Sequence, residues 1–357
     1  MSLYPQYINK QINIPYLLKI GQGKTKKIGK YLVDKGMNRV ALFMGYGIED
    51  ILGKELYAGL EAQKITVSYK MVVDDIDIDT ITHTAFNLPK VDAILGIGGG
   101  KALDFAKYSA YLLKLPFISV PTSTSNDGFC SPTSSLTVQG KRKTVKSGIP
   151  YGVVIDLDII KNSPSIFFYS GIGDMVSKIT ALWDWKEAFN KGFERFNDFA
   201  SLLAYNSLDL LFLKHSSDIS SVEFQRSLAN SLMMSGISME VAGTSRPASG
   251  SEHLISHALD ALSEKPKMHG VQVGVATYLC ALLQNNPHLP RVKDILLNTG
   301  FFEFAKTTPF NKKEFIDALK LAPSIKTDYY TILSEKESFE KALKFIETDE
   351  ILKELIK

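Results

Sequence analysis

Short apolar runs and longer amphipathic segments alternate through the first half of the chain. Five runs, each bounded by Gly, Pro or Asp, occupy residues 39–44, 67–73, 92–98, 116–120 and 151–156. Their length and nearly continuous hydrophobicity predict strands that are buried in a mostly parallel sheet. The segments that start at Glu49, Asp77 and Lys101 repeat apolar residues at three-and-four spacing, which predicts crossover helices. The first half is therefore expected to form an open α/β sheet.

The pattern changes near residue 160. After Ser163 the strand signals stop, and three later segments carry helical periodicity: 173–189, 222–243 and 270–284. We therefore expect two domains, a Rossmann-like α/β domain over residues 1–160 and an all-α domain over residues 161–357.

The composition fits soluble globular domains. The chain has 357 residues, of which 45% are hydrophobic and 22% charged, and its net charge is +3. A chain of this length and hydrophobicity can bury more than one core. Nucleic-acid binding normally needs a clear basic excess on one face, so the near-neutral balance argues against a nucleic-acid partner.

Cysteine usage and the apolar stretches bear on the compartment. Cys130 and Cys280 are too few for a disulfide framework, which favours a reducing, cytoplasmic setting. The first 15 residues contain no apolar run of signal-peptide length. Polar residues, Lys214 among them, interrupt the most apolar stretch at 199–215, so no membrane span is expected.

A glycine run lies where a predicted strand meets a predicted helix. Gly98, Gly99 and Gly100 end the run at 92–98 and directly precede the helix expected from Lys101. Glycines there let a pyrophosphate approach the backbone, and the helix N-terminus offers unpaired N–H groups to it. The run is neither GxGxxG nor a Walker loop, and a simple tight turn is the alternative interpretation.

A hydroxyl-rich segment, PTSTSNDGFCSPTSS, follows the next predicted strand. Carboxyl ends of neighbouring parallel strands share one edge of the sheet, where open α/β folds bind ligands. Thr122, Ser125 and Ser131 would then lie along the same crevice as the glycine run. A Ser/Thr-rich surface loop is the alternative.

Metal-ligand residue types gather in the second half. Asp174 follows a Gly-Ile-Gly sequence that is interpreted as a turn opening a helix, His253 and His257 are four residues apart on one helix face, and His269 begins the next helix. One carboxylate and two imidazoles would leave a coordination position open, as catalytic metal sites do. The spacing does not decide which histidines bind, and histidines satisfied by hydrogen bonds are the alternative. The HExxH arrangement is missing, so peptide hydrolysis is not indicated.

These motifs occur together in one known group of proteins. The segments GGGKALDFAKYSA, PFISVPTSTSNDGFCSP, GIGDMVSKITALWDW, SRPASGSEHLISHALD and HGVQVG appear in this order between about residues 90 and 280. The set resembles the superfamily of glycerol dehydrogenase, iron-containing alcohol dehydrogenases and 3-dehydroquinate synthase, and most closely its sn-glycerol-1-phosphate dehydrogenase family. The resemblance implies the dehydroquinate synthase-like fold.

The resemblance also implies roles for individual residues. The metal ligands would be Asp174, His253 and His269, while Asp127 and His257 would be catalytic and contact the substrate together with Asp174. The dinucleotide would be held by Gly98, Gly99, Gly100, Lys101, Ala102, Thr122, Ser125 and Ser131, with Asp104 supporting the loop. Lys178 stands where relatives with a fourth ligand have a histidine, so three ligands are expected. Zinc is the expected metal, with nickel as the alternative.

The implied reaction is the reduction of dihydroxyacetone phosphate to sn-glycerol-1-phosphate by NADH or NADPH, which would feed glycerolipid synthesis. The residues Met44, Gly45 and Tyr46 end an early strand without the acid that usually binds the ribose 2′-hydroxyl of NAD, so use of both cofactors is expected. The substrate phosphate needs a cation. Candidates are Arg246 and the basic run 141–146, although a solvated hairpin is the simpler interpretation of that run.

Three other functions remain open from the sequence. An NAD-dependent glycerol or other polyol dehydrogenase would use the same metal site without a phosphate. A synthase that uses NAD transiently and eliminates phosphate would share the fold. A nucleotide-binding module would lack catalysis. The family likeness further suggests a homo-oligomer, a dimer or larger.

Overall fold

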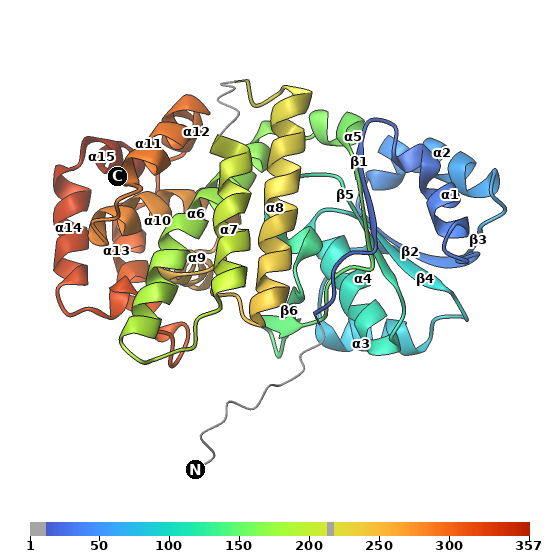
Figure 1. Ribbon diagram of the computed structural model, residues 1–357, viewed down its shortest axis with the longest axis horizontal. Helices are drawn as coiled ribbons and strands as arrows, with labels where there is room; N and C mark the ends of the chain where they lie inside the picture. The colour runs from blue at the N-terminus through green and yellow to red at the C-terminus, as the bar shows by residue number, and fades with distance from the viewer. Residues whose placement is uncertain (1–11, 213–217) are drawn as a thin grey trace, which may run out of the picture.

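The first half of the protein is built on one six-stranded, fully parallel sheet (Figure 1). The computed structural model describes residues 12–212 and 218–357. The strands are β1 (Leu17–Gly21), β2 (Arg39–Gly45), β3 (Thr66–Val73), β4 (Ala93–Gly98), β5 (Phe117–Pro121) and β8 (Gly152–Asp156), in the order β1-β8-β5-β4-β2-β3. The five predicted strands are all present. The prediction missed β1, a short strand at the sheet edge that pairs with β8.

Helices cover both faces of the sheet, as the amphipathic segments predicted. The flanking helices are α1 (Ile28–Val33), α2 (Ile48–Glu61), α3 (Ile78–Phe86) and α4 (Gly100–Leu113), with a 3-10 turn η1 (Thr25–Lys27) before them. Alternate residues of β2 face opposite layers: Leu42 packs in the cluster that includes α1 and α2, and Phe43 packs in the cluster that includes α3 and α4. The chain leaves β2 and β4 in opposite directions, so their carboxyl ends form a topological switch point.

A small antiparallel hairpin lies outside the main sheet. It consists of β6 (Thr133–Val138) and β7 (Lys141–Lys146), which follow a 3-10 turn η2 (Asp127–Cys130). The basic side chains of β7 are exposed, as the interpretation of a solvated hairpin requires.

Beyond β8 the described chain is helical, which confirms the predicted fold class (Figure 1). The helices are α5 (Leu157–Lys161), α6 (Ser165–Asn190), α7 (Asp198–Phe212), α8 (Val222–Ala242), α9 (Ser251–Leu262), α10 (His269–Leu283), α11 (Leu289–Asn298), α12 (Phe301–Lys306), α13 (Lys312–Leu321), α14 (Ser338–Thr348) and α15 (Glu350–Leu355), with 3-10 turns η3 (Ala322–Ser324) and η4 (Ile332–Ser334). The largest apolar cluster runs from β2 to the chain end and so crosses the boundary expected near residue 160. The two-domain division stays a prediction.

One local prediction is wrong. Asp174 does not open a helix after a Gly-Ile-Gly turn, because the helix α6 already begins at Ser165 and Asp174 lies in its interior. The glycines serve close packing instead of a turn. A Cβ on Gly173 would lie 1.9 Å from the carbonyl oxygen of Gly270, and a Cβ on Gly171 would lie 2.0 Å from that of Thr124. Both distances are far below van der Waals contact, so only glycine lets α6 approach α10 and the loop after β5 this closely.

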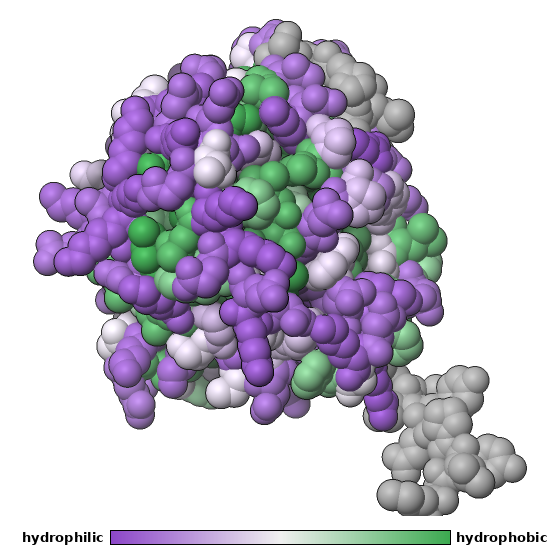
Figure 2. Space-filling model, turned by 90° about the vertical axis from the view of Figure 1, so that its left-hand side faces the viewer, coloured by the Kyte–Doolittle hydropathy of each residue, from purple (hydrophilic) through white to green (hydrophobic). Residues whose placement is uncertain are grey.

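The helical half presents a mixed outer surface. Figure 2 shows the face toward α14, where apolar side chains are visible between hydrophilic ones. None of the helices within residues 12–212 and 218–357 combines the length with the hydrophobicity that a membrane-spanning helix needs. Lys214 and the first 11 residues, on which two of the sequence expectations rest, lie outside the described residues. Cys130 and Cys280 are both buried and unpaired.

Candidate active site

The structure brings Asp174, His253 and His269 together. One ligand atom from each of the three side chains lies within 4.8 Å of the other two. Asp174 projects from α6, His253 from α9, and His269 from the first turn of α10. The close packing of α6 on α10 and of α9 on both helices produces this cluster. Their role as metal ligands remains a prediction that the geometry permits.

The distances within the cluster suit a tetrahedral ion. Nε2 of His253 lies 3.5 Å from Oδ1 of Asp174. Two donor atoms at about 2.0–2.1 Å from a tetrahedral ion lie about 3.4 Å apart, so both atoms can bind the same ion without rearrangement.

Hydrogen bonds on the far side of each imidazole leave Nε2 free to face an ion. Nδ1 of His253 lies 2.8 Å from Oε1 of Glu252, a carboxylate that only accepts, so His253 donates through Nδ1. Ser256 donates its hydroxyl to Gln272, so its oxygen is left to accept the Nδ1–H of His269, 3.2 Å away. Such partners orient ligating histidines and fix their tautomers.

A buried lysine links two carboxylates beside the cluster. The ammonium of Lys178 lies 3.1 Å from Oδ1 of Asp174 and 3.2 Å from Oδ2 of Asp127. Oδ2 of Asp174 accepts the backbone N–H of Asp127 at 2.9 Å, and Oδ2 of Asp127 accepts the hydroxyl of Ser235. Asp127 lies in η2, which follows the carboxyl end of β5. The network therefore joins the carboxyl end of the sheet to α6.

The same network sets the ionisation of the carboxylates. Burial raises the pKa of Asp174, but the charge of Lys178 and the neighbouring imidazole of His253 outweigh it and hold that pKa below its usual range. Burial lowers the pKa of Lys178, but the two carboxylates raise it further, so the ammonium stays charged. Burial and the charge of Asp174 raise the pKa of Asp127.

His257 lies on the more open side of the cluster. Its ring centroid is 6.1 Å from that of His269 and 6.4 Å from that of His253. Asp174 and His253 are buried, whereas His257 and His269 are half-buried, so a substrate can approach from this side. Burial and the neighbouring positive charges keep the pKa of His257 well below its usual value, so this imidazole is neutral at neutral pH.

The glycine run lies at the switch point between β2 and β4. Gly98 has a φ of +140° and lies against Gly45, the last residue of β2. A Cβ on Gly99 or Gly100 would meet no atom within 4 Å, and both residues are exposed at the N-terminus of α4. The start of α4 is therefore unobstructed at these two glycines, as binding of a pyrophosphate to the N–H groups of the helix terminus requires. Lys101 is exposed and donates to a carbonyl of residue 74, while Ala102 is buried.

The hydroxyl-rich segment begins beside this glycine run. The backbone N–H of Thr122 donates to the carbonyl of Gly98 at 3.1 Å, and Thr122 and Ser125 are half-buried. Ser131 is buried, with its hydroxyl 3.1 Å from the carbonyl oxygen of Thr133. Its proposed contact with the dinucleotide therefore remains a prediction that needs a shift of this hydroxyl.

Asp104 supports the loop through contacts of its own. It accepts the backbone N–H of Ser135 and forms an ion pair with Lys107 at 3.3 Å. The buried ammonium of Lys107 also donates to the carbonyls of Gly128 and Thr133, which fixes the segment that carries Asp127.

The structure removes Arg246 from the candidate cations for a phosphate. Its side chain is fully buried, and its guanidinium donates to both oxygens of Glu194 and to the carbonyl of Tyr330. Its charge is therefore already paired. Arg142 on β7 is exposed and donates to the hydroxyl of Ser135.

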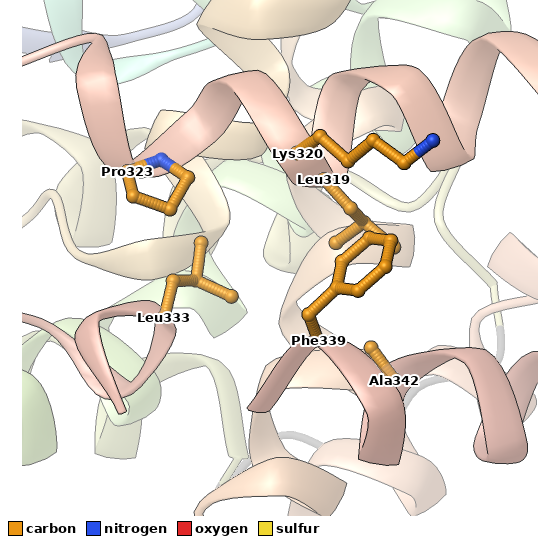
Figure 3. A pocket seen from close by; sticks show the side chains of 6 residues that line it. All are labelled: Leu319, Lys320, Pro323, Leu333, Phe339 and Ala342. Carbon is orange, nitrogen blue, oxygen red and sulfur yellow. The ribbon is translucent and has the colours of Figure 1, made fainter. Parts of the chain in front are cut away.

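A separate hollow of about 240 Å³ opens between α13 and α14 (Figure 3). It is lined by Leu319, Lys320, Pro323, Leu333, Phe339 and Ala342. This lining offers no metal-ligating side chain, so the hollow is no candidate for the redox chemistry.

Sequence reasoning missed the residues that orient the cluster. Glu252 directly precedes His253, and Ser256 follows it by three residues. Their closeness to a suspected ligand in the sequence was the available signal for an orienting role. Ser235 lies in α8, far from Asp127 along the chain, and no local sequence pattern predicts its hydrogen bond to that carboxylate.

Comparison with known proteins identifies relatives over nearly the whole chain. The family model described as iron-containing alcohol dehydrogenase matches residues 19–164. A glycerol-1-phosphate dehydrogenase (NAD(P)+) of Aeropyrum pernix is 34% identical, and the match covers 91% of this chain and 94% of the relative. A protein of the same name from Methanobrevibacter smithii is 33% identical over 94% of this chain and 98% of its own length. One from Thermococcus sibiricus is 38% identical over 71% and 74%.

Solved structures share the fold at lower identity. Glycerol dehydrogenase from Schizosaccharomyces pombe superposes with a TM-score of 0.77 at 19% identity, over 97% of this chain and 91% of that one. Sulfoacetaldehyde reductase from Bifidobacterium kashiwanohense, solved in complex with NAD+, gives a TM-score of 0.72 at 15% identity, over 95% and 98%.

Proposed function

Because this chain belongs to the glycerol-1-phosphate dehydrogenase family, we propose that it reduces dihydroxyacetone phosphate to sn-glycerol-1-phosphate with NADH or NADPH, and catalyses the reverse oxidation. One observation carries the proposal. Asp174, His253 and His269 converge beside the half-buried His257. Asp127 connects this cluster to the carboxyl end of the sheet, where the glycine run lies. An oxidoreductase of this type needs its cofactor site and its metal site at one cleft.

The two halves would divide the binding work. In this proposal residues 1–160 bind the dinucleotide through the glycine run and the segment 122–131, and residues 161–357 bind the metal and most of the substrate. The open space above Gly99 and Gly100 supports the first assignment, and the hydrogen-bonded histidines support the second.

When bound, a divalent metal supplies a Lewis acid that stabilises negative charge on the ketone oxygen, and the dinucleotide supplies the hydride. His253 and His269 would hold the metal through Nε2, and Asp174 through Oδ1. His257, neutral at neutral pH, would accept the hydroxyl proton during oxidation and return it, directly or through water, during reduction. Oδ2 of Asp127 is engaged by Lys178 and Ser235, which leaves Oδ1 for a substrate hydroxyl.

We propose zinc as the metal. Two imidazoles and one carboxylate with tetrahedral spacing suit it, and the same donor set admits nickel. Metal content of protein purified without added metal, followed by reconstitution with each ion separately, distinguishes the two.

A product assay tests the proposed reaction. With metal and NAD(P)H present, kcat/KM for dihydroxyacetone phosphate should exceed that for free dihydroxyacetone by at least about 10-fold, because the phosphate adds a charge-assisted contact. Chiral analysis should identify the product as the sn-1 isomer. A higher kcat/KM on the free ketone would favour a polyol dehydrogenase instead.

Cofactor selectivity should be weak. Tyr46, exposed at the end of β2, stands close to where NAD-specific enzymes carry an acid that repels the 2′-phosphate of NADP. We expect kcat/KM values for NADH and NADPH to lie within about 100-fold of each other, a window set by the one missing repulsive contact. Initial rates over a range of each cofactor measure this. A larger preference for NADH would reveal a repulsive group elsewhere.

We further propose that the product feeds glycerolipid synthesis and that the protein acts in the cytoplasm as a homo-oligomer. Light scattering of the purified protein tests the last point directly.

A further inference from the structure

Lys326 is a cation that forms no ion pair with a carboxylate of the described residues. It follows η3 and is half-buried. Its ammonium lies 3.4 Å from the hydroxyl of Ser245 and 4.4 Å from the ring centroid of Tyr329. Among residues 12–212 and 218–357, no carboxylate lies within ion-pair distance of this ammonium. Burying a charge without a partner is costly, and burial lowers the pKa of Lys326 to about 8.

The contacts of Lys326 attach it to the loop that leads into the site. Ser245 opens the segment 245–250, which runs directly into α9 and His253. Tyr329, beneath Lys326, donates its hydroxyl to the carbonyl of Ser249 in the same segment. The charge of Lys326 also contributes to the lowered pKa of His257, after burial and the two other histidines. The hydroxyl contact with Ser245 therefore places Lys326 against the segment that leads into α9, the helix that carries His253 and His257.

The other cations near the site are engaged or more exposed. Lys178 is paired with two carboxylates, and Arg246 with Glu194. Arg142 is exposed and bonded to a hydroxyl, so water weakens its contribution. A desolvated ammonium with a neighbouring hydroxyl donor is the better phosphate contact.

We propose that Lys326, with the hydroxyl of Ser245, binds the phosphate group of the substrate and so determines the preference for a phosphorylated over a free ketone. The proposal rests on the function proposed above. A phosphate dianion would give Lys326 the partner that it lacks and would satisfy the Ser245 hydroxyl in the same step.

Kinetics of the full-length, metal-loaded Lys326→Met variant test this. Met keeps the apolar stem and removes the charge. We expect kcat/KM for dihydroxyacetone phosphate to fall about 10- to 100-fold, the size of one charge-assisted contact, and kcat/KM for free dihydroxyacetone to stay within about 2-fold. Lys326→Arg should recover part of the loss. Lys320→Met is the matched control, because Lys320 is exposed on α13 and pairs with Asp317.

A second readout needs no turnover of the phosphorylated substrate. Inorganic phosphate should inhibit reduction of free dihydroxyacetone competitively by the wild-type protein and at least about 10-fold more weakly by Lys326→Met. Equal losses on both ketones, or unchanged inhibition by phosphate, would overturn the proposal.

The design separates this inference from the proposed function. If the wild-type protein itself prefers free dihydroxyacetone, the proposed function fails whatever the variant does. If the wild type prefers the phosphorylated ketone and Lys326→Met keeps that preference, only the role of Lys326 fails. A parallel Arg142→Gln variant that loses the preference instead would also overturn it.

Discussion

Replacing His253 by Ala is expected to lower kcat/KM by about 1,000-fold or more and to reduce the bound metal well below one ion per chain. A Lewis acid at a developing oxyanion stabilises the transition state by several kcal/mol. Each 1.36 kcal/mol of lost stabilisation lowers the rate about tenfold. The substitution removes one of the two proposed nitrogen donors and leaves only His269 and Asp174 to hold the metal. Steady-state kinetics and elemental analysis of the purified variant measure both effects.

The exposed His83 on α3 provides the matched control. His83→Ala removes an exposed imidazole that does not belong to the ligand cluster, so this variant should keep full activity and metal content. Chelation of the wild-type protein should reproduce the His253→Ala loss, and added Zn²⁺ or Ni²⁺ should restore activity only to the chelated wild type. A folded His253→Ala protein with normal metal content and normal kcat/KM would refute the assigned ligand.

Replacing Gly173 by Ala is expected to destabilise the protein by about 3 kcal/mol or more, at the upper end of overpacking effects. The added Cβ would lie 1.9 Å from the Gly270 carbonyl oxygen, and both partners are helix backbone that cannot move aside independently. Relief of the clash requires α6 and α10 to separate, which also pulls Asp174 away from His269. Denaturant unfolding followed by circular dichroism gives the free-energy change.

Gly99→Ala serves as the comparison for that variant. Gly99 has a φ of −84°, and a Cβ there meets no atom within 4 Å, so the fold should be unaffected. If the glycine run binds the dinucleotide as proposed, the added methyl would occupy part of that binding site and raise KM for NAD(P)H. Equal unfolding midpoints for wild type and Gly173→Ala would show that α6 and α10 can repack at no cost.

The sheet could be predicted because four of its strands, β2, β4, β5 and β8, are almost completely buried. Runs such as the one at 92–98 are nearly all apolar and end at Gly or Asp, so their type and boundaries are both visible in the sequence. The strand β1 escaped because it is a short edge strand with exposed Leu18. The helix boundary at Ser165 escaped because glycines more often mark turns than helix contacts, and only the position of α10 reveals their purpose.

The candidate site could be predicted only in part, for a physical reason. Residue types and spacing singled out Asp174 and three histidines, but the choice among the histidines depends on how α9 packs against α10, which no local pattern encodes. Lys326 lies in a segment without any motif. Its significance arises from its surroundings among the described residues, where no carboxylate forms an ion pair with its ammonium, and these surroundings are visible in three dimensions alone.

The ammonium of Lys178 restricts how the two halves of the protein can move relative to each other. It joins Asp127, which follows the sheet, to Asp174, which lies in the helical half, and the lysine itself is fully buried. Removing one partner of a buried ion pair costs about 3–5 kcal/mol, so this contact opposes separation of the two halves at this point. If the two halves rotate apart to exchange a nucleotide, we expect Lys178 to lie near the axis of that rotation, with the outer edge of the sheet moving furthest.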